Sequence, residues 1–203
     1  MSITSPPPPL LMGAPPEPIW RLSVAQYHQM IQAGILTEGD PVELLEGILV
    51  TKMVKNPPHT LATQLTRTAL ERCMPPGWFA NTQEPVTTDT SEPEPDVTVV
   101  RGERRQYAQR HPGPADLGML VEVADSSLRQ DRTTKKRIYA RASIPIYWIV
   151  NLVDRQIEVY TEPTGAAEQP DYRQRRDYGP TDSVPVVIDG REFGQIPVGE
   201  LLP

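Results

Sequence analysis

The chain has 203 residues, 38% of them hydrophobic and 23% charged, a composition typical of a globular protein with one domain. This composition excludes a collagen-like fibre, a coiled coil and wholesale disorder. Twenty Lys and Arg against 26 Asp and Glu give a net charge of −6, so the overall field repels nucleic acid, and any such contact needs a local basic patch.

The start of the chain is unusually rich in proline. Seven of the 24 prolines fall within residues 1–18, where the missing backbone donors predict an extended, flexible arm. We therefore expect a Pro-rich arm over residues 1–18 and a single domain over residues 19–203. Deleting the arm should leave thermal stability nearly unchanged, because it offers almost no repeating apolar face.

The first predicted element of the domain is a helix capped by Ser23 and ended by Gly34. Its predicted apolar face consists of Val24, Tyr27, Met30 and Ile31. Residues 42–54 follow as a strand pair bent at Gly47. A second helix is predicted over residues 59–73, where apolar residues recur at helical spacing before a Pro-Pro-Gly stop.

The rest of the chain alternates short apolar runs with one further helix. We predict strands over residues 78–88, 96–100, 119–124, 147–152, 156–160, 172–178 and 184–188, and a helix over residues 128–142. This mixed order predicts an α/β fold with a mixed central sheet flanked by helices.

Compartment and covalent cross-linking follow from a few counts. The single cysteine, Cys73, cannot form an intramolecular disulfide or a cysteine-based zinc site, and we interpret it as an ordinary helix residue. No run approaches about 18 apolar residues, and the N-terminus lacks the pattern of a signal peptide. We therefore expect a cytoplasmic protein that does not associate with membranes.

Two acidic residues stand out because they accompany apolar strands. Glu122 lies within an otherwise apolar run, and burying its carboxylate unpaired would cost several kcal/mol. Asp96 opens another apolar strand directly after Pro95. Carboxylates brought together from neighbouring strands suit Mg²⁺ or Mn²⁺, although each acid taken alone is better explained by a salt bridge.

The helix that follows the Glu122 strand is strongly basic. Asp131 is its one acidic residue. Its six basic residues are Arg129, Arg132, Lys135, Lys136, Arg137 and Arg141. A lysine on its inner face could offer an ammonium to an attacking water or to a phosphate oxygen. For the outer arginines, a solvated helix face is the simpler interpretation.

These segments together resemble a known family. The quoted segments are Glu43-Leu-Leu-Glu-Gly-Ile-Leu-Val, His59 at a helix start, Pro95-Asp96-Val-Thr-Val-Val, Val121-Glu122-Val-Ala-Asp125-Ser-Ser, Asp131-Arg-Thr-Thr-Lys135-Lys-Arg-Ile-Tyr139 and Pro145-Ile-Tyr147-Trp148-Ile-Val. In this order they resemble the Uma-two family of the PD-(D/E)XK restriction-endonuclease-like superfamily. The resemblance covers about residues 21–202.

The resemblance implies roles for individual residues. Asp96 takes the place of the motif aspartate and Glu122 that of the motif acid, so these two are the expected metal ligands. The usual lysine position, two residues after the acid, holds Ala124. Lys135 matches the place to which the lysine has moved in this family, with Lys136 as a one-residue alternative.

Four further positions are left with weaker assignments or none. Glu43 matches an early acid of the family and would assist the metal site, although an exposed strand carboxylate explains it nearly as well. His59 matches in position but without a role that its chemistry supplies. His28 and His111 match nothing and are expected at the surface.

The leading hypothesis is a Mg²⁺- or Mn²⁺-dependent endonuclease that hydrolyses DNA, with Asp96, Glu122, Lys135 and Glu43 as its catalytic set. One alternative is a nucleic-acid-binding or assembly module that keeps the nuclease scaffold without turnover, and the acidic net charge favours it slightly. A glycosidase using the two carboxylates leaves the lysine and the basic helix unexplained. The nuclease hypothesis predicts that the Asp96 and Glu122 carboxylates converge at one edge of the sheet.

A homodimer is the last expectation. The apolar and aromatic strands around Tyr147, Trp148 and Tyr160 carry more large side chains than one face of a small sheet normally buries. A two-fold partner could cover them, and two copies would also bring two basic helices to one duplex. The alternative cover is the chain's own segment over residues 184–202.

Overall fold

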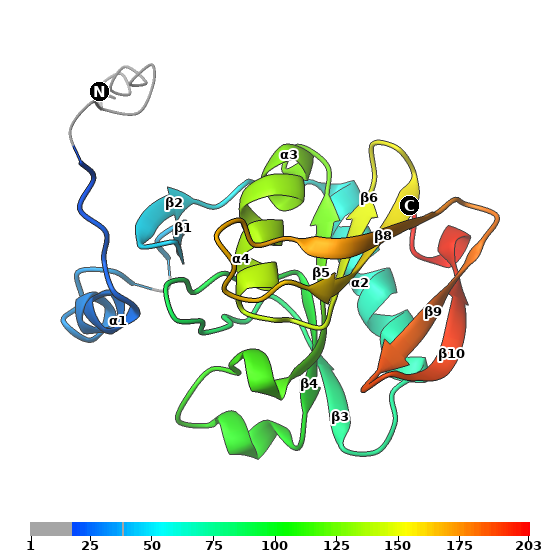
Figure 1. Ribbon diagram of the computed structural model, residues 1–203, viewed down its shortest axis with the longest axis horizontal. Coiled ribbons are helices and arrows are strands. Elements are labelled where there is room, and N and C mark those ends of the chain that lie inside the picture. Colours follow the sequence, from blue (N-terminus) through cyan, green and yellow to red (C-terminus); the bar gives the residue numbers. More distant parts are fainter. Residues whose placement is uncertain (1–17, 38) are drawn as a thin grey trace, which may run out of the picture.

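A six-stranded mixed sheet forms the centre of the protein, as the computed structural model, which describes residues 18–37 and 39–203, shows in Figure 1. Its order is β3-β4-β5-β6-β7-β8; β5 and β6 pair in parallel, and the other neighbours are antiparallel. The strands are β3 (Trp78–Asn81), β4 (Val97–Arg101), β5 (Leu117–Ala124), β6 (Ile146–Asn151), β7 (Gln156–Pro163) and β8 (Tyr172–Tyr178). The α/β fold with a mixed central sheet is confirmed.

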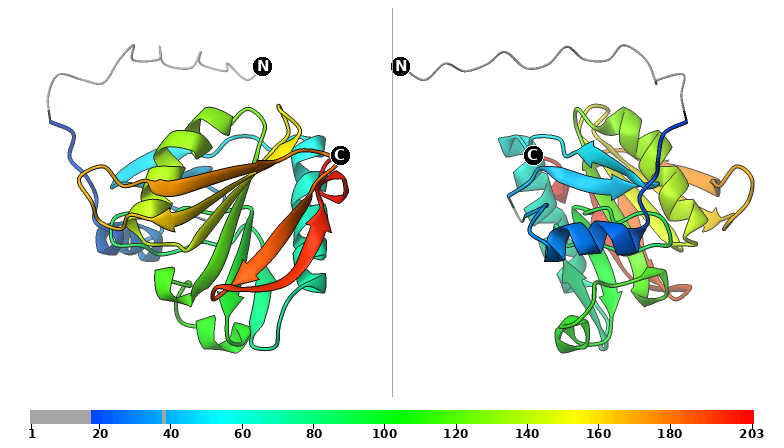
Figure 2. Two further views of the ribbon diagram at one scale, coloured as in Figure 1. Left: turned by 45° about the vertical axis from the view of Figure 1, so that its right-hand side comes forward. Right: turned by 90° about the vertical axis from the view of Figure 1, so that its left-hand side faces the viewer.

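Helical segments and a small ribbon cover the two faces of this sheet (Figure 2). One face carries α2 (Pro57–Arg72) and the ribbon of β9 (Ser183–Ile188) and β10 (Arg191–Pro197); the other carries α3 (Leu128–Gln130), the π-helical turn η3 (Asp131–Lys135) and α4 (Lys136–Arg141). Three short 3₁₀ turns are η1 (Arg104–Tyr107), η2 (Pro114–Asp116) and η4 (Val198–Glu200). No described helix is long and apolar enough to span a bilayer.

Alternation along the strands divides the core into two clusters. On β5, Val121 points toward α2 and the ribbon, whereas Leu120 points toward α4. Both strands in the middle of the sheet, β5 and β6, are buried along their whole length, because each face of the sheet is covered. Glu122 shares the α4 face with Leu120, and this placement decides where its carboxylate can go.

A separate hairpin beside the sheet holds the first acidic candidate. Strands β1 (Val42–Leu45) and β2 (Ile48–Thr51) meet at a two-residue turn in which Glu46 and Gly47 both have positive φ. The backbone N–H of Glu92 donates to the carbonyl of Leu44 at 2.7 Å, which fixes the hairpin to the segment that leads into β4. Helix α1 (Val24–Gln32) packs beside the hairpin (Figure 2), with Tyr27 buried.

Two predicted elements differ from the structure. The strand predicted over residues 78–88 ends at Asn81, because Gln83 has a positive φ and the following segment bonds to residues 91–95 instead, with Val86 N–H donating to Pro93. The predicted apolar face of the first helix is only partly buried, since Ile31 is 44% exposed. The arm predicted for residues 1–18 lies, apart from Pro18, outside the described residues.

The apolar β6 and β7 strands are covered within the chain. Trp148 and Ile157 pack in one cluster with Val184, Ile196 and Leu201, so the C-terminal segment takes the place that a partner subunit could have filled. On the opposite face, α4 and neighbouring aromatic residues bury Tyr147 and Tyr160. The homodimer remains a prediction, but its argument from uncovered apolar side chains is wrong.

The hairpin turn provides a test of this local packing. A Cβ added at Gly47 (φ +78°) would lie 2.7 Å from Cβ of Arg21 and 2.8 Å from the carbonyl oxygen of Leu22, whereas at Gly34 (φ +70°) it would meet nothing within 4 Å. Gly34→Ala should cost about 1 kcal/mol for the backbone conformation alone. Gly47→Ala should cost at least about twice that, because a clash adds to the strain. Equal losses in thermal unfolding of the two variants would contradict the packing described here.

Candidate metal-dependent active site

A narrow pocket opens where β4 begins and β5 ends, on the α4 side of the sheet. Its volume is about 70 Å³, roughly the space of two water molecules at about 30 Å³ each. The residues that line it come from the hairpin, the β2–α2 loop, α2, the segment before β4, and the turn from β5 into η3. Asp96, Glu122, Lys135, Glu43 and His59, all named from the sequence, line this one pocket.

The strand register brings Asp96 and Glu122 to the same face. Val97 pairs with Val121 in an antiparallel ladder, so Asp96, one residue earlier, stands across from Glu122. The Oδ2 atom of Asp96 accepts a hydrogen bond from the backbone N–H of Val123 at 2.9 Å. The two acids therefore lie on the same face of the sheet, close to where the interior strand β4 begins and β5 ends.

Lys135 reaches the acids from the far side of the pocket. Its ammonium donates to Oε1 of Glu122 at 2.9 Å and lies 3.6 Å from Oε1 of Glu43. Lys136 points elsewhere, since its ammonium lies 2.8 Å from Asp171. Between the two lysines that the sequence leaves open, the structure places Lys135 at the acids.

The π-helical turn η3 gives Lys135 its direction. The N–H of Lys136 donates to the carbonyl of Asp131, five residues earlier, and the hydroxyl of Tyr147 donates to the same carbonyl at 3.2 Å. This wide turn interrupts the helix predicted over residues 128–142, and both of its end residues, Asp131 and Lys135, are buried. Single π turns of this kind occur often at functional sites.

Glu43 is a buried residue, so the alternative of an exposed strand carboxylate is wrong. It is 4% exposed, and its Oε2 accepts from the backbone N–H of Glu94 at 3.1 Å while Oε1 faces Lys135. The hairpin therefore contributes a carboxylate to the pocket wall.

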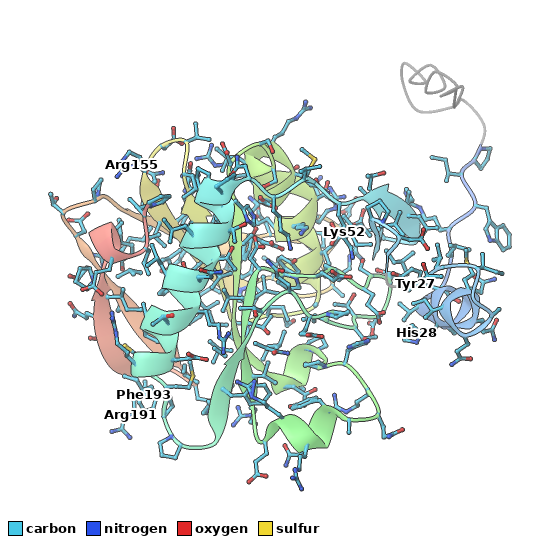
Figure 3. The ribbon with its side chains drawn as sticks, turned by 180° about the vertical axis from the view of Figure 1, so that it is seen from behind. Tyr27, His28, Lys52, Arg155, Arg191 and Phe193 are labelled. Carbon is cyan, nitrogen blue, oxygen red and sulfur yellow. The ribbon has the colours of Figure 1, made fainter. Side chains whose placement is uncertain are left out.

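His59 stands in the first turn of α2, where Asn56 caps the helix by accepting from the His59 N–H. Its Nε2 lies 3.1 Å from Oδ2 of Asp96, and its Nδ1 is buried without a hydrogen-bond partner in the described residues. His59 thus contacts the same oxygen of Asp96 that accepts from Val123. Of the other histidines, His111 is exposed as expected, but His28 on α1 (Figure 3) is half-buried, with Nε2 2.7 Å from the buried Glu92.

Sequence reasoning missed Asp131 as a member of the site. It is 1% exposed, lines the pocket and accepts from the Ser127 hydroxyl at 2.6 Å. The available signal was a lone acid in a basic helix, four residues before Lys135 and therefore near the same helix face. This signal does not assign Asp131 to the site, because an acid among six basic residues also suits a solvated ion pair.

Burial and crowding change the acid–base properties of these groups. Burial raises the pKa of Glu122 to about 8. The negative charges of Asp131 and Asp96 also raise this pKa, whereas the positive charge of Lys135 lowers it. Burial likewise raises the pKa of Asp131 to about 6. Burial works to lower the pKa of Lys135, but the Glu122, Glu43 and Asp131 carboxylates outweigh it and raise the pKa, so the ammonium stays charged.

The donor set fits a divalent cation. Four buried acids (Glu43, Asp96, Glu122 and Asp131) and one lysine line the pocket, although in the described part of the chain no three of the acidic or histidine side chains already converge as a metal-binding cluster. A cation would offset the burial and repulsion that raise the pKa of Glu122 and Asp131, and would favour their ionised forms. Within the described residues, the hydrogen bonds of Asp96 go to Oδ2 and those of Glu122 to Oε1, from Lys135 and Tyr139. Oδ1 and Oε2 are therefore left for an oxygen-preferring ion such as Mg²⁺ or Mn²⁺.

The fold and this pocket define an α/β protein of the restriction-endonuclease-like class. The sequence model of the Uma2 (Uma-two) family, described as "Putative restriction endonuclease", matches residues 24–190. The chain therefore belongs to the Uma2 family, which confirms the resemblance of its motifs.

One solved structure with a similar fold is described as a "putative nuclease belonging to DUF820" from Anabaena variabilis. It is 14% identical, and the match covers 89% of this chain and 97% of that chain with a TM-score of 0.65. A comparison with curated proteins gave no match.

Proposed function

We propose that this protein is a metal-dependent endonuclease that hydrolyses phosphodiester bonds of DNA, with Asp96 and Glu122 as ligands of Mg²⁺ or Mn²⁺. The observation that carries the proposal is the pairing of these two buried carboxylates across β4 and β5, each with one oxygen left free, beside the charged Lys135. Membership of a family described as "Putative restriction endonuclease", and a similar fold in a protein described as a "putative nuclease", support it.

Each group in the pocket has a distinct part in this reaction. The bound cation would polarise the phosphate and lower the pKa of a coordinated water. Lys135 donates hydrogen bonds that orient the attacking water or a phosphate oxygen, and its charge stabilises the negative charge that grows during in-line attack. It stays protonated, so it acts as a donor and not as a base. Glu43 assists by holding Lys135 against Glu122.

The direct test is cleavage by the purified chain. Supercoiled, linear duplex and single-stranded DNA are incubated with Mg²⁺, with Mn²⁺ or with a chelator, beside an Asp96→Ala preparation purified in the same way. We expect cleavage that needs the metal and is absent from Asp96→Ala. Equal cleavage by the variant would identify a contaminating nuclease, and DNA binding without cleavage would favour the scaffold without turnover.

The two adjacent lysines provide a matched pair of variants. Lys135→Met should lower the rate of cleavage by about 10²–10³-fold, because a positioned charged donor is removed from the pocket. Lys136→Met should leave the rate within about twofold, since its partner Asp171 is exposed and outside the pocket. Similar losses in the two initial rates, at unchanged melting temperature, would show that Lys135 has no special part.

A further inference from the structure

The rim of the pocket carries exposed apolar side chains. In the loop over residues 52–56, between β2 and α2, Met53 is 49% exposed and Val54 is 92% exposed, and both line the same pocket as Asp96 and Glu122. Large apolar residues this exposed at the mouth of a polar pocket are available to a ligand that has an apolar face.

The loop is held in place at both ends. Lys52, labelled in Figure 3, forms an ion pair with Glu94, and its backbone N–H donates to the carbonyl of Pro41 at 2.8 Å. At the other end, Nδ2 of Asn56 donates to Oδ2 of Asp125 at 2.6 Å, and the Asn56 side chain also caps α2. The apolar side chains between these anchors are therefore presented at a fixed position beside the acids.

The acids lie too deep for the backbone of an intact duplex. Asp96 and Glu122 are only 4% and 3% exposed in the wall of a cavity of about 70 Å³, and the Asn56–Asp125 hydrogen bond joins the loop to the turn after β5. A duplex is stiff over about 150 base pairs and cannot turn one phosphate inward without local distortion. An unpaired strand bends freely, and its bases are available for stacking.

Charge at the mouth also favours a short contact. Lys55 lines the pocket and takes part in no ion pair within the described residues. One such cation on a chain of net charge −6 is little beside the roughly 6–10 phosphate contacts of proteins that depend on the duplex backbone. Apolar contact between a base and the exposed side chains would supply the remaining affinity.

We infer that the pocket takes an unpaired strand of nucleic acid, with a base packed on Met53 and Val54 and the adjoining phosphate beside Lys55. This inference rests on the proposed nuclease function and gives its substrate class: single strands, or the unpaired segments of branched and damaged duplexes. Met53 and Val54 contact the face of the base, and Lys55 contacts the phosphate. The buried acids can be reached only by a backbone that bends into the pocket.

The test is binding measured by fluorescence anisotropy, with Ca²⁺ as the only divalent cation. Labelled 20-mers are a DNA single strand, its duplex, the same single strand with abasic sites at its centre, and the RNA strand of the same sequence. The proteins are the full chain, a Met53→Ser/Val54→Ser variant and the control Val153→Ser. The control also replaces an exposed apolar side chain, 57% exposed, but in the turn between β6 and β7.

We expect the single strand to bind at least about tenfold more tightly than the duplex. The double variant should lose about tenfold on the single strand, because it removes the apolar surface on which the base packs, and lose little on the abasic strand. Val153→Ser should match the wild type. If the RNA strand binds as tightly as the DNA single strand, recognition depends on the base and phosphate that both share. If the RNA strand binds more weakly, the ligand is unpaired DNA.

Two results would overturn the inference. One is duplex binding as tight as single-strand binding; the other is a double variant with undiminished affinity, which would leave the apolar rim to a protein partner. Failure of the nuclease proposal gives a different pattern, in which single-strand binding follows the expected order while Mg²⁺ and Mn²⁺ support no cleavage.

Discussion

Replacing Glu122 by Gln is expected to reduce metal-dependent DNA cleavage at least about a thousandfold, which corresponds to about 4 kcal/mol of transition-state stabilisation. The amide keeps the size of the side chain and can still bond to Tyr139, but it removes the charge that holds the cation and pairs with Lys135. Asp96→Asn should have a similar effect, because it removes the other ligand from the opposing strand.

A remote acid serves as the control for this experiment. Asp189→Asn removes an exposed carboxylate that is paired with Arg101, far from the pocket in sequence, and should leave the rate within about twofold. Initial rates at saturating Mg²⁺, with melting temperatures measured in parallel, separate lost chemistry from lost folding. A Glu122→Gln enzyme with near-normal rates would remove the basis for this assignment.

The second large effect concerns a carboxylate that the sequence did not single out. Glu158 on β7 is fully buried and accepts hydrogen bonds from Arg132 and Asn151 and from the Tyr160 hydroxyl, with Arg175 3.3 Å away. Because Arg132 belongs to η3, this cluster attaches the π turn to the sheet. Glu158→Ala should cost about 3 kcal/mol, because it removes the buried acceptor of the Tyr160 hydroxyl and leaves Arg132 and Asn151 with Asp154 as their remaining acceptor.

The neighbouring strand supplies a matched control. Asp177 on β8 bonds to Arg175 but is exposed, so Asp177→Ala should cost about 1 kcal/mol or less. At about 2–4 °C per kcal/mol for a chain of this size, the two variants should differ by roughly 5 °C or more in melting temperature. If both variants melted together, the cluster around Glu158 would not stabilise the fold as described.

Acid sensitivity gives the same cluster a second readout. Burial works to raise the pKa of Glu158, but hydrogen bonds from Arg132, Tyr160 and Asn151 outweigh it and lower the pKa. A lowered folded-state pKa means that the carboxylate contributes stability above its ordinary pKa and loses that contribution as the pH falls through the folded value. Glu158→Gln should therefore unfold with a weaker dependence on pH between about 5 and 3 than the wild type.

Much of this fold could be predicted from local sequence patterns. The short apolar runs at 96–100, 119–124 and 147–152 predict strands, and these are present as β4, β5 and β6. Their continuous apolar pattern reflects a sheet that is covered on both faces. The end of β3 was misplaced because the segment after Asn81 bonds to residues 91–95, and periodicity carries no information about such a contact. The ribbon strand β10 was missed, since glycine and exposed polar residues interrupt its pattern.

The site shows the same division between local and distant information. Glu122 and Asp96 could be picked out because carboxylates that accompany apolar strands need partners, and the family resemblance pointed to Lys135 within the basic helix. Asp131 could not be assigned, because its burial depends on the π turn and on the Tyr147 hydroxyl that bonds to its carbonyl. The hydrogen bond that joins Asn56 to Asp125 connects residues 69 positions apart, which no local pattern indicates.

Isothermal titration with Mn²⁺ tests most directly whether Asp96 and Glu122 form a metal site. Wild type, Asp96→Ala, Glu122→Ala and the control Asp189→Asn are titrated under the same conditions, after circular dichroism confirms that each is folded. The account predicts one saturable site in wild type and in Asp189→Asn, with affinity at least about tenfold weaker in both site variants. Equal Mn²⁺ affinity in all four proteins, or no binding to the wild type, would contradict it.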